Sequence, residues 1–94
     1  MQKYVIEREI PNIGEAPADA LAGAAAKSNG VLSSMTKEAK GIQWEHSYVT
    51  GDRTFCIYFA ESEDLIHEHA EQSGFPASKI SRVSTMIDPM TANQ

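Results

Sequence analysis

The groups in this sequence that could bind a metal ion or move a proton are concentrated between residues 41 and 70. This stretch holds all three histidines, the only cysteine and the only tryptophan of the chain. His46 and Cys56 lie in two neighbouring runs of alternating side chains, whereas His67 and His69 follow in a segment with a helical pattern. Neutral imidazole is a good ligand for nickel, zinc or copper. The chemistry of the chain is therefore expected on a hairpin and on the helix that follows it.

The two alternating runs, residues 42–50 and 53–60, flank Gly51 and Asp52, a pair typical of a tight hairpin turn. Direct pairing across this turn divides the side chains between two faces. One face carries Trp44, His46, Tyr48, Phe55, Ile57 and Phe59, and the other carries Glu45, Ser47, Val49, Thr54, Cys56 and Tyr58. We expect helices to cover the first face, although this pattern leaves the opposite choice open. Cys56 points away from His46 in this register, so the two do not share a site within one chain.

Residues 61–73 are predicted to form a helix that begins in an acidic turn and ends at Gly74. His69 lies in its apolar stripe, and His67 lies on its exposed side with glutamates four residues away in both directions. His69 is either a core histidine satisfied by one hydrogen bond or, with His46 in the same layer, half of a two-imidazole metal site. His67 is either part of a solvated surface or a metal ligand on the helix face.

Two further strands and one further helix complete the predicted domain. Residues 3–10 and 80–87 alternate like strands, and an alanine-rich stripe predicts a helix from about Pro17 to Met35. The resulting βαββαβ order is that of the ferredoxin-like α+β sandwich, a four-stranded antiparallel sheet with two helices on one face. We expect residues 1–94 to form a single domain of this kind.

The second face of the predicted sheet has no helix to cover it, although it holds apolar side chains. Because such a surface is typical of an interface, we expect a homodimer packed through the sheet face, as in dimeric α+β barrels. The chain has 94 residues and a net charge of -5, and its scattered basic residues exclude a nucleic-acid groove. No apolar run approaches the roughly 20 residues that span a bilayer. With no recognisable signal peptide, a cytoplasmic protein without membrane association is expected.

The sequence contains no nucleophile elbow, phosphate-binding loop, CxxC or HExxH motif. Polar side chains do gather on the second face, namely Glu7, Glu45, Ser47, Cys56 and Tyr58. Paired carboxylates there could perform acid–base chemistry if burial raised one pKa toward neutrality. We prefer the interpretation that these residues form the rim of the dimer interface. The sequence therefore favours a binding protein over an enzyme.

Four segments of the chain resemble a family of small bacterial proteins, formerly a domain of unknown function, whose characterised member is described as a nickel-binding protein. They are KYVIEREIP, IQWEHSYVTGDRTFCIYFA, IHEHAEQSGFPASKI and MIDPMT, in that order. The resemblance implies a ferredoxin-like fold, a homodimer and a capacity to bind nickel. His46 and His69 lie in segments that are similar to the family, whereas His67 occupies a position less typical of it.

The leading hypothesis is a small cytoplasmic homodimer that binds nickel for buffering or sequestration. Its predicted metal ligands are His46, His69 and His67. An alternative is a small-molecule binder or monooxygenase-like enzyme of the dimeric α+β barrel type, whose pocket would be walled by Trp44, Tyr48, Phe55, Cys56 and Tyr58. A third interpretation is a purely structural dimerisation module.

Overall fold

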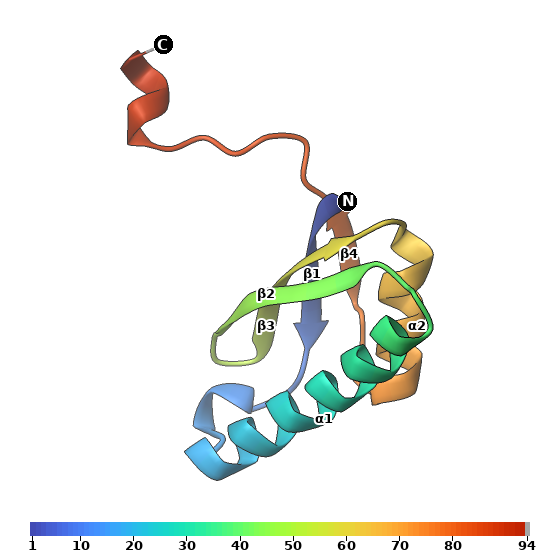
Figure 1. The fold of residues 1–94 in the computed structure, drawn as a ribbon. Helices are drawn as coiled ribbons and strands as arrows, with labels where there is room; N and C mark the ends of the chain where they lie inside the picture. Colours follow the sequence, from blue (N-terminus) through green and yellow to red (C-terminus); the bar gives the residue numbers. More distant parts are fainter. Residues whose placement is uncertain (94) are drawn as a thin grey trace.

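The computed structural model describes residues 1–93 of the chain (Figure 1). Its order of strands and helices is βαββαβ, with a 3-10 helix before the first α-helix and another near the C-terminus. The elements are β1 (Gln2–Glu9), η1 (Ile13–Glu15), α1 (Ala18–Lys37), β2 (Ile42–Val49), β3 (Arg53–Ala60), α2 (Glu63–Ser73), β4 (Lys79–Arg82) and η2 (Pro89–Asn93). The order that the sequence predicts is therefore confirmed.

The four strands form one sheet in the order β2-β3-β1-β4, and all neighbouring strands are antiparallel. Both helices lie together on one side of this sheet (Figure 1). The central pair, β1 and β3, is in register over the full length of both strands, from Gln2 opposite Ala60 to Glu9 opposite Arg53. This arrangement is the predicted ferredoxin-like α+β sandwich.

The helices cover the opposite face of the hairpin from the one that the sequence analysis favoured. Cys56 and Tyr58 are buried under the helices, whereas Ile57 is only half-buried on the other face. Apolar residues occur on both faces of β3, so its alternation does not identify the buried side. The pairing with β1 decides it. Three charged residues of β1 share the face of Phe55, namely Lys3, Glu7 and Glu9, and covering all of them would be costly. The face of Cys56 receives Tyr4, Ile6 and a single charge, Arg8. The predicted assignment of the hairpin faces is wrong for this reason.

A β-bulge at Glu45 shifts the register in the middle of β2. Trp44 pairs with Tyr58, whereas His46 pairs with Ile57, which leaves Glu45 as the extra residue. Trp44 consequently joins the helix-covered side, and His46 stays on the open side. The prediction that Trp44 and His46 share one face of the hairpin is therefore wrong.

The two helices follow the capping signals of the sequence. Pro17, which has no N–H to leave unpaired, precedes α1, and the helix buries Ser28 and Met35, two turns apart. The second helix buries Ile66, His69 and Ser73 at steps of three and four residues. It ends as predicted at Gly74, whose φ of 78° is readily adopted only by glycine.

Strand β4 is shorter than the sequence pattern predicts and ends at Arg82 rather than at residue 87. Val83 makes the last contact, donating its N–H to the Lys3 carbonyl at 2.8 Å. Val83 therefore lies opposite Lys3, one residue from the end of β1 at Gln2, so little of β1 is left along which β4 could continue. The following segment extends away from the domain and ends in η2 (Figure 1). Within the described residues, no helix is long and apolar enough to cross a membrane.

Candidate functional site

The three histidines do not meet within one chain. His69 belongs to the core on the helix-covered side and is 1% exposed. His46 lies on the open side of the sheet, on the edge strand β2, and its side chain is 45% exposed. The sheet therefore separates the two imidazoles. The prediction that they converge between helix and sheet is wrong, because it depended on the incorrect face assignment of the hairpin.

His46 has two polar neighbours on the open side of the sheet. Its Nε2 is 3.1 Å from the Tyr48 hydroxyl, and its Nδ1 is 3.9 Å from the Glu45 carboxylate. The β-bulge produces this arrangement, because the extra residue brings Glu45 next to the ring of His46. The same carboxylate is 3.9 Å from Lys3 Nζ. We call His46, Glu45 and Tyr48 the bulge cluster.

His67 lies on the exposed face of α2, as predicted, with its Nε2 3.2 Å from the Glu63 carboxylate one turn earlier. Both side chains are more than half exposed, and an exposed i, i+4 pair of this kind stabilises a helix only slightly. No group of three histidine, cysteine or acidic side chains is placed to hold a metal ion anywhere in residues 1–93 of a single chain.

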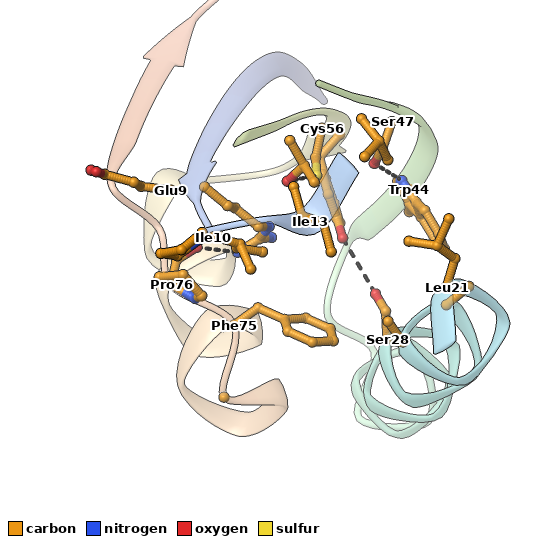
Figure 2. Close-up of a pocket in the computed structure, with 18 residues that line it drawn as sticks. Glu9, Ile10, Ile13, Leu21, Ser28, Trp44, Ser47, Cys56, Phe75 and Pro76 are labelled. Atoms are coloured by element: carbon orange, nitrogen blue, oxygen red, sulfur yellow. Dashed lines mark hydrogen bonds between the residues drawn. The ribbon is translucent and has the colours of Figure 1, made fainter. Parts of the chain in front are cut away.

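A cleft of about 540 Å³ lies on the other side of the sheet, between the sheet, the first half of α1 and the segment that follows α2 (Figure 2). Leu21 of α1 and Phe75 after α2 extend toward it from opposite sides (Figure 2). Two alanines of α1, Ala24 and Ala25, also line it. Because these small side chains do not reach the sheet, they leave the space between the layers open. Further apolar lining comes from Ile10, Pro11, Ile13, Trp44, Val49 and Pro76.

Arg8 is the only buried side chain with a permanent charge among the described residues, and it lines this cleft. The alternation of β1 places it on the same face as Tyr4 and Ile6, so only 3% of its surface is exposed. Its Nη1 donates a hydrogen bond to the Pro76 carbonyl at 2.9 Å, whereas its buried Nη2 has no partner in residues 1–93. No carboxylate of these residues forms an ion pair with it. Glu9, the next residue, points away from the cleft (Figure 2).

A chain of polar side chains continues from the cleft into the core. The Tyr58 hydroxyl is 3.4 Å from Ser28 Oγ, which is 2.9 Å from Nε2 of His69. Burial, reinforced by the positive charge of Arg8, lowers the pKa of His69 to about 4. Burial also raises the pKa of Tyr58, an effect that Ser28 and Arg8 oppose. His69 and Tyr58 are therefore both neutral at pH 7, and the charge of Arg8 has no counterion within residues 1–93.

The alternating pattern of β1 was the signal that could have identified Arg8 from the sequence. Arg8 comes two positions after Ile6 and four after Tyr4, so it must share their face of the strand, and this is where the cleft forms. Ser28 could not be recognised in the same way, because its role depends on the Tyr58 and His69 side chains that surround it. Of the pocket walls that the sequence analysis named, Trp44, Cys56 and Tyr58 line the cleft, whereas Tyr48 and Phe55 belong to the open face.

Fold and site together define a small ferredoxin-like α+β protein with one open sheet face and one cleft beneath the helices. Residues 4–83 match the family model described as nickel responsive protein SCO4226-like. The chain belongs to this family. Its structure is similar to the crystal structure of SCO4226 from Streptomyces coelicolor A3(2), with a TM-score of 0.72 and 15% sequence identity over 90% of this chain and 99% of that chain. A search of curated protein sequences gives no significant match.

Proposed function

We propose that this protein binds nickel through His46 on the open face of its sheet and that the complete site forms in a homodimer. The family to which the chain belongs is named for its response to nickel. The observation that carries the proposal is the bulge cluster, in which an accessible imidazole, a carboxylate and a phenol lie side by side. A role in buffering or sequestering the ion follows, and the cytoplasm is the compartment we propose for it, since a lone cysteine stays reduced there.

The bulge cluster has the chemistry of half a metal site. If His46 donates its Nε2–H to the Tyr48 oxygen, its Nδ1 carries the lone pair on the side of Glu45. Histidine ligands commonly use their second ring nitrogen in this way, which fixes the tautomer and the ring orientation. With bonds of about 2.1 Å to nitrogen and oxygen, one metal ion can join two ligand atoms that are up to roughly 4.2 Å apart. The 3.9 Å separation between Nδ1 and the Glu45 carboxylate lies within this limit.

A homodimer would supply the ligands that one chain lacks. The open face holds a half-buried apolar group formed by Val5, Phe55, Ile57, Phe59 and Val83. The C-terminal segment adds three strongly exposed apolar side chains, Met86, Ile87 and Met90. Both surfaces find an apolar partner if a second copy packs on the sheet. A two-fold arrangement also doubles the bulge cluster to two imidazoles and two carboxylates, which suit nickel or zinc.

Calorimetric titration with Ni²⁺ tests the proposal on protein without a histidine tag. We expect His46→Ala to weaken nickel binding by about tenfold or more, as loss of a ligand should. His67→Ala is the matched control, because it removes an exposed imidazole outside the bulge cluster. Light scattering on the same samples should give the mass of a dimer. Unchanged nickel affinity in His46→Ala would exclude this site. If light scattering shows a monomer and the protein still binds nickel tightly, the second copy has no role in the site.

The alternative of a small-molecule binder is supported by a separate observation, the apolar cleft beneath the helices. The cleft does not include any residue of the bulge cluster. The two functions can therefore coexist in one protein, and an experiment that refutes one does not refute the other.

A further inference from the structure

We propose that the cleft binds a small molecule that combines one carboxylate group with an apolar body, and that Arg8 recognises the carboxylate. This inference does not depend on nickel binding, because the bulge cluster lies on the opposite face of the sheet. It assigns a ligand class to a site that the resemblance to a nickel-responsive family does not explain.

The first step is the charge of Arg8. A guanidinium group stays protonated in proteins, and a buried charge without a counterion is strongly unfavourable. Arg8 is 3% exposed, its Nη2 has no partner, and no carboxylate in residues 1–93 pairs with it. The hydrogen bond from Nη1 to the Pro76 carbonyl fixes the orientation of the group without neutralising it. An anion that enters the cleft would satisfy both the free N–H groups and the charge.

The second step selects a carboxylate among anions. One positive charge in an apolar cleft is balanced by a monoanion, whereas a phosphate dianion would leave excess negative charge in a poorly solvated space. The planar guanidinium also matches the geometry of a planar carboxylate. His69, which is neutral because its pKa is lowered to about 4, adds no second positive charge. The hydroxyls of Tyr58 and Ser28 offer further polar contacts near Arg8.

The third step concerns the rest of the ligand. A cleft of about 540 Å³ is within the usual range for small-molecule sites. Its walls are mostly aliphatic and aromatic, and they include Trp44, which stacks on Tyr58 with a centroid distance of 6.4 Å. Apolar walls around one charged anchor are typical of sites for amphiphilic acids, because the walls bury the hydrocarbon while the anchor sets its direction. A short fatty acid or an arylalkanoic acid has this chemistry.

The intrinsic fluorescence of Trp44 provides a direct assay, because it is the only tryptophan of the chain and lines the cleft. The probes are octanoate and 3-phenylpropanoate, with octanamide as the neutral analogue and octyl phosphate as the second anion. We expect a saturable fluorescence change with the carboxylates. Octanamide should bind about tenfold more weakly or worse, since it lacks the charge-assisted contact. Octyl phosphate should also bind more weakly than octanoate.

Three variants connect binding to the named residues. Arg8→Gln should weaken the binding of octanoate by about tenfold or more while leaving the binding of octanamide nearly unchanged. Arg53→Gln, which removes an exposed arginine of the same sheet, should leave both affinities within about twofold, as expected for a screened surface charge. Ala24→Leu, which fills the cleft but retains Arg8, should abolish binding of every probe. His46→Ala should bind octanoate normally, which distinguishes this site from the proposed nickel site.

Two results would overturn the whole proposal, and a third would overturn its assignment of a carboxylate. One is equal affinity for octanamide and octanoate in the unmodified protein, a comparison that needs no variant and so does not depend on the folding of Arg8→Gln. The other is the lack of any saturable change with either carboxylate up to about 10 mM, which is weaker than a specific site of this size should be. If octyl phosphate binds most tightly, the site is an anion site of a different class and the carboxylate assignment is wrong.

Discussion

His69 should make the stability of this domain depend on pH between about 4 and 6.5. Its imidazole is 1% exposed, and burial together with the charge of Arg8 lowers its pKa from 6.5 to about 4. In the unfolded chain His69 takes up a proton as the pH falls through about 6.5. In the folded domain it stays neutral until about pH 4. Between these values the unfolded state binds more protons, so acid favours unfolding.

The size of the effect follows from the difference between the two pKa values. The difference between a pKa of 6.5 and a pKa of about 4 corresponds to about 3 kcal/mol. The stabilisation is fully present above pH 6.5 and is lost progressively as the pH falls toward 4. Small domains are stable by only about 5–15 kcal/mol, so about 3 kcal/mol from one side chain is a substantial fraction of the total stability.

Urea unfolding measured at half-unit steps between pH 4 and 7.5 tests this prediction. His69→Gln should flatten the pH dependence of the free energy of unfolding by about 3 kcal/mol over this range, whatever its effect on stability at neutral pH. His67→Gln is the matched control, because it removes an exposed imidazole two residues away on the same helix. Parallel pH curves for the unmodified protein and His69→Gln would refute the argument that a neutral, buried His69 resists protonation.

Three further substitutions test the packing. In urea unfolding, Gly14→Ala should destabilise the domain by about 1–3 kcal/mol, because the new Cβ would lie 2.7 Å from the backbone carbonyl oxygen of Thr50. Unchanged stability would show that η1 can move away from the hairpin turn. Gly30→Ala should raise the melting temperature, with a gain of up to about 1 kcal/mol, since the position is exposed within α1 and has open space around it; a lower melting temperature would contradict this. In the same assay, Ile6→Ala should lower the free energy of unfolding by about 2–5 kcal/mol, because Ile6 is completely buried in the core. A loss of less than about 1 kcal/mol would mean that the core collapses around the space left by the side chain.

Local patterns in the sequence were sufficient for the elements and their order. The period of two in β1 and the hairpin strands, the apolar stripes of the helices, and Gly74 as a helix end all depend on neighbours within a few residues. The βαββαβ order then restricts the fold, because few arrangements of these elements bury every apolar face. The family resemblance agreed with this result, and the family model and the similar crystal structure confirm it.

The candidate sites depended on contacts that no local pattern contains. One extra residue in β2, Glu45, places the side chains of Trp44 and His46 on opposite faces of the sheet. The face covered by the helices was decided by the partner strand β1, since β3 is apolar on both sides. A single incorrect face assignment therefore placed His46 and His69 in one layer, whereas the folded chain has the sheet between them.

The sequence by itself determined the fold class of this protein and collected its histidines on one hairpin and one helix. Only the tertiary structure decided that His69 is a buried neutral imidazole and that His46 is accessible beside Glu45. It also decided that Arg8 is enclosed with no counterion among the residues that the structure describes. The physical reason is that secondary structure follows from local periodicity, whereas the burial of a charge depends on which distant segments cover it. In this chain α1 and the segment after α2 provide that cover, and the cleft they leave gives Arg8 its proposed role.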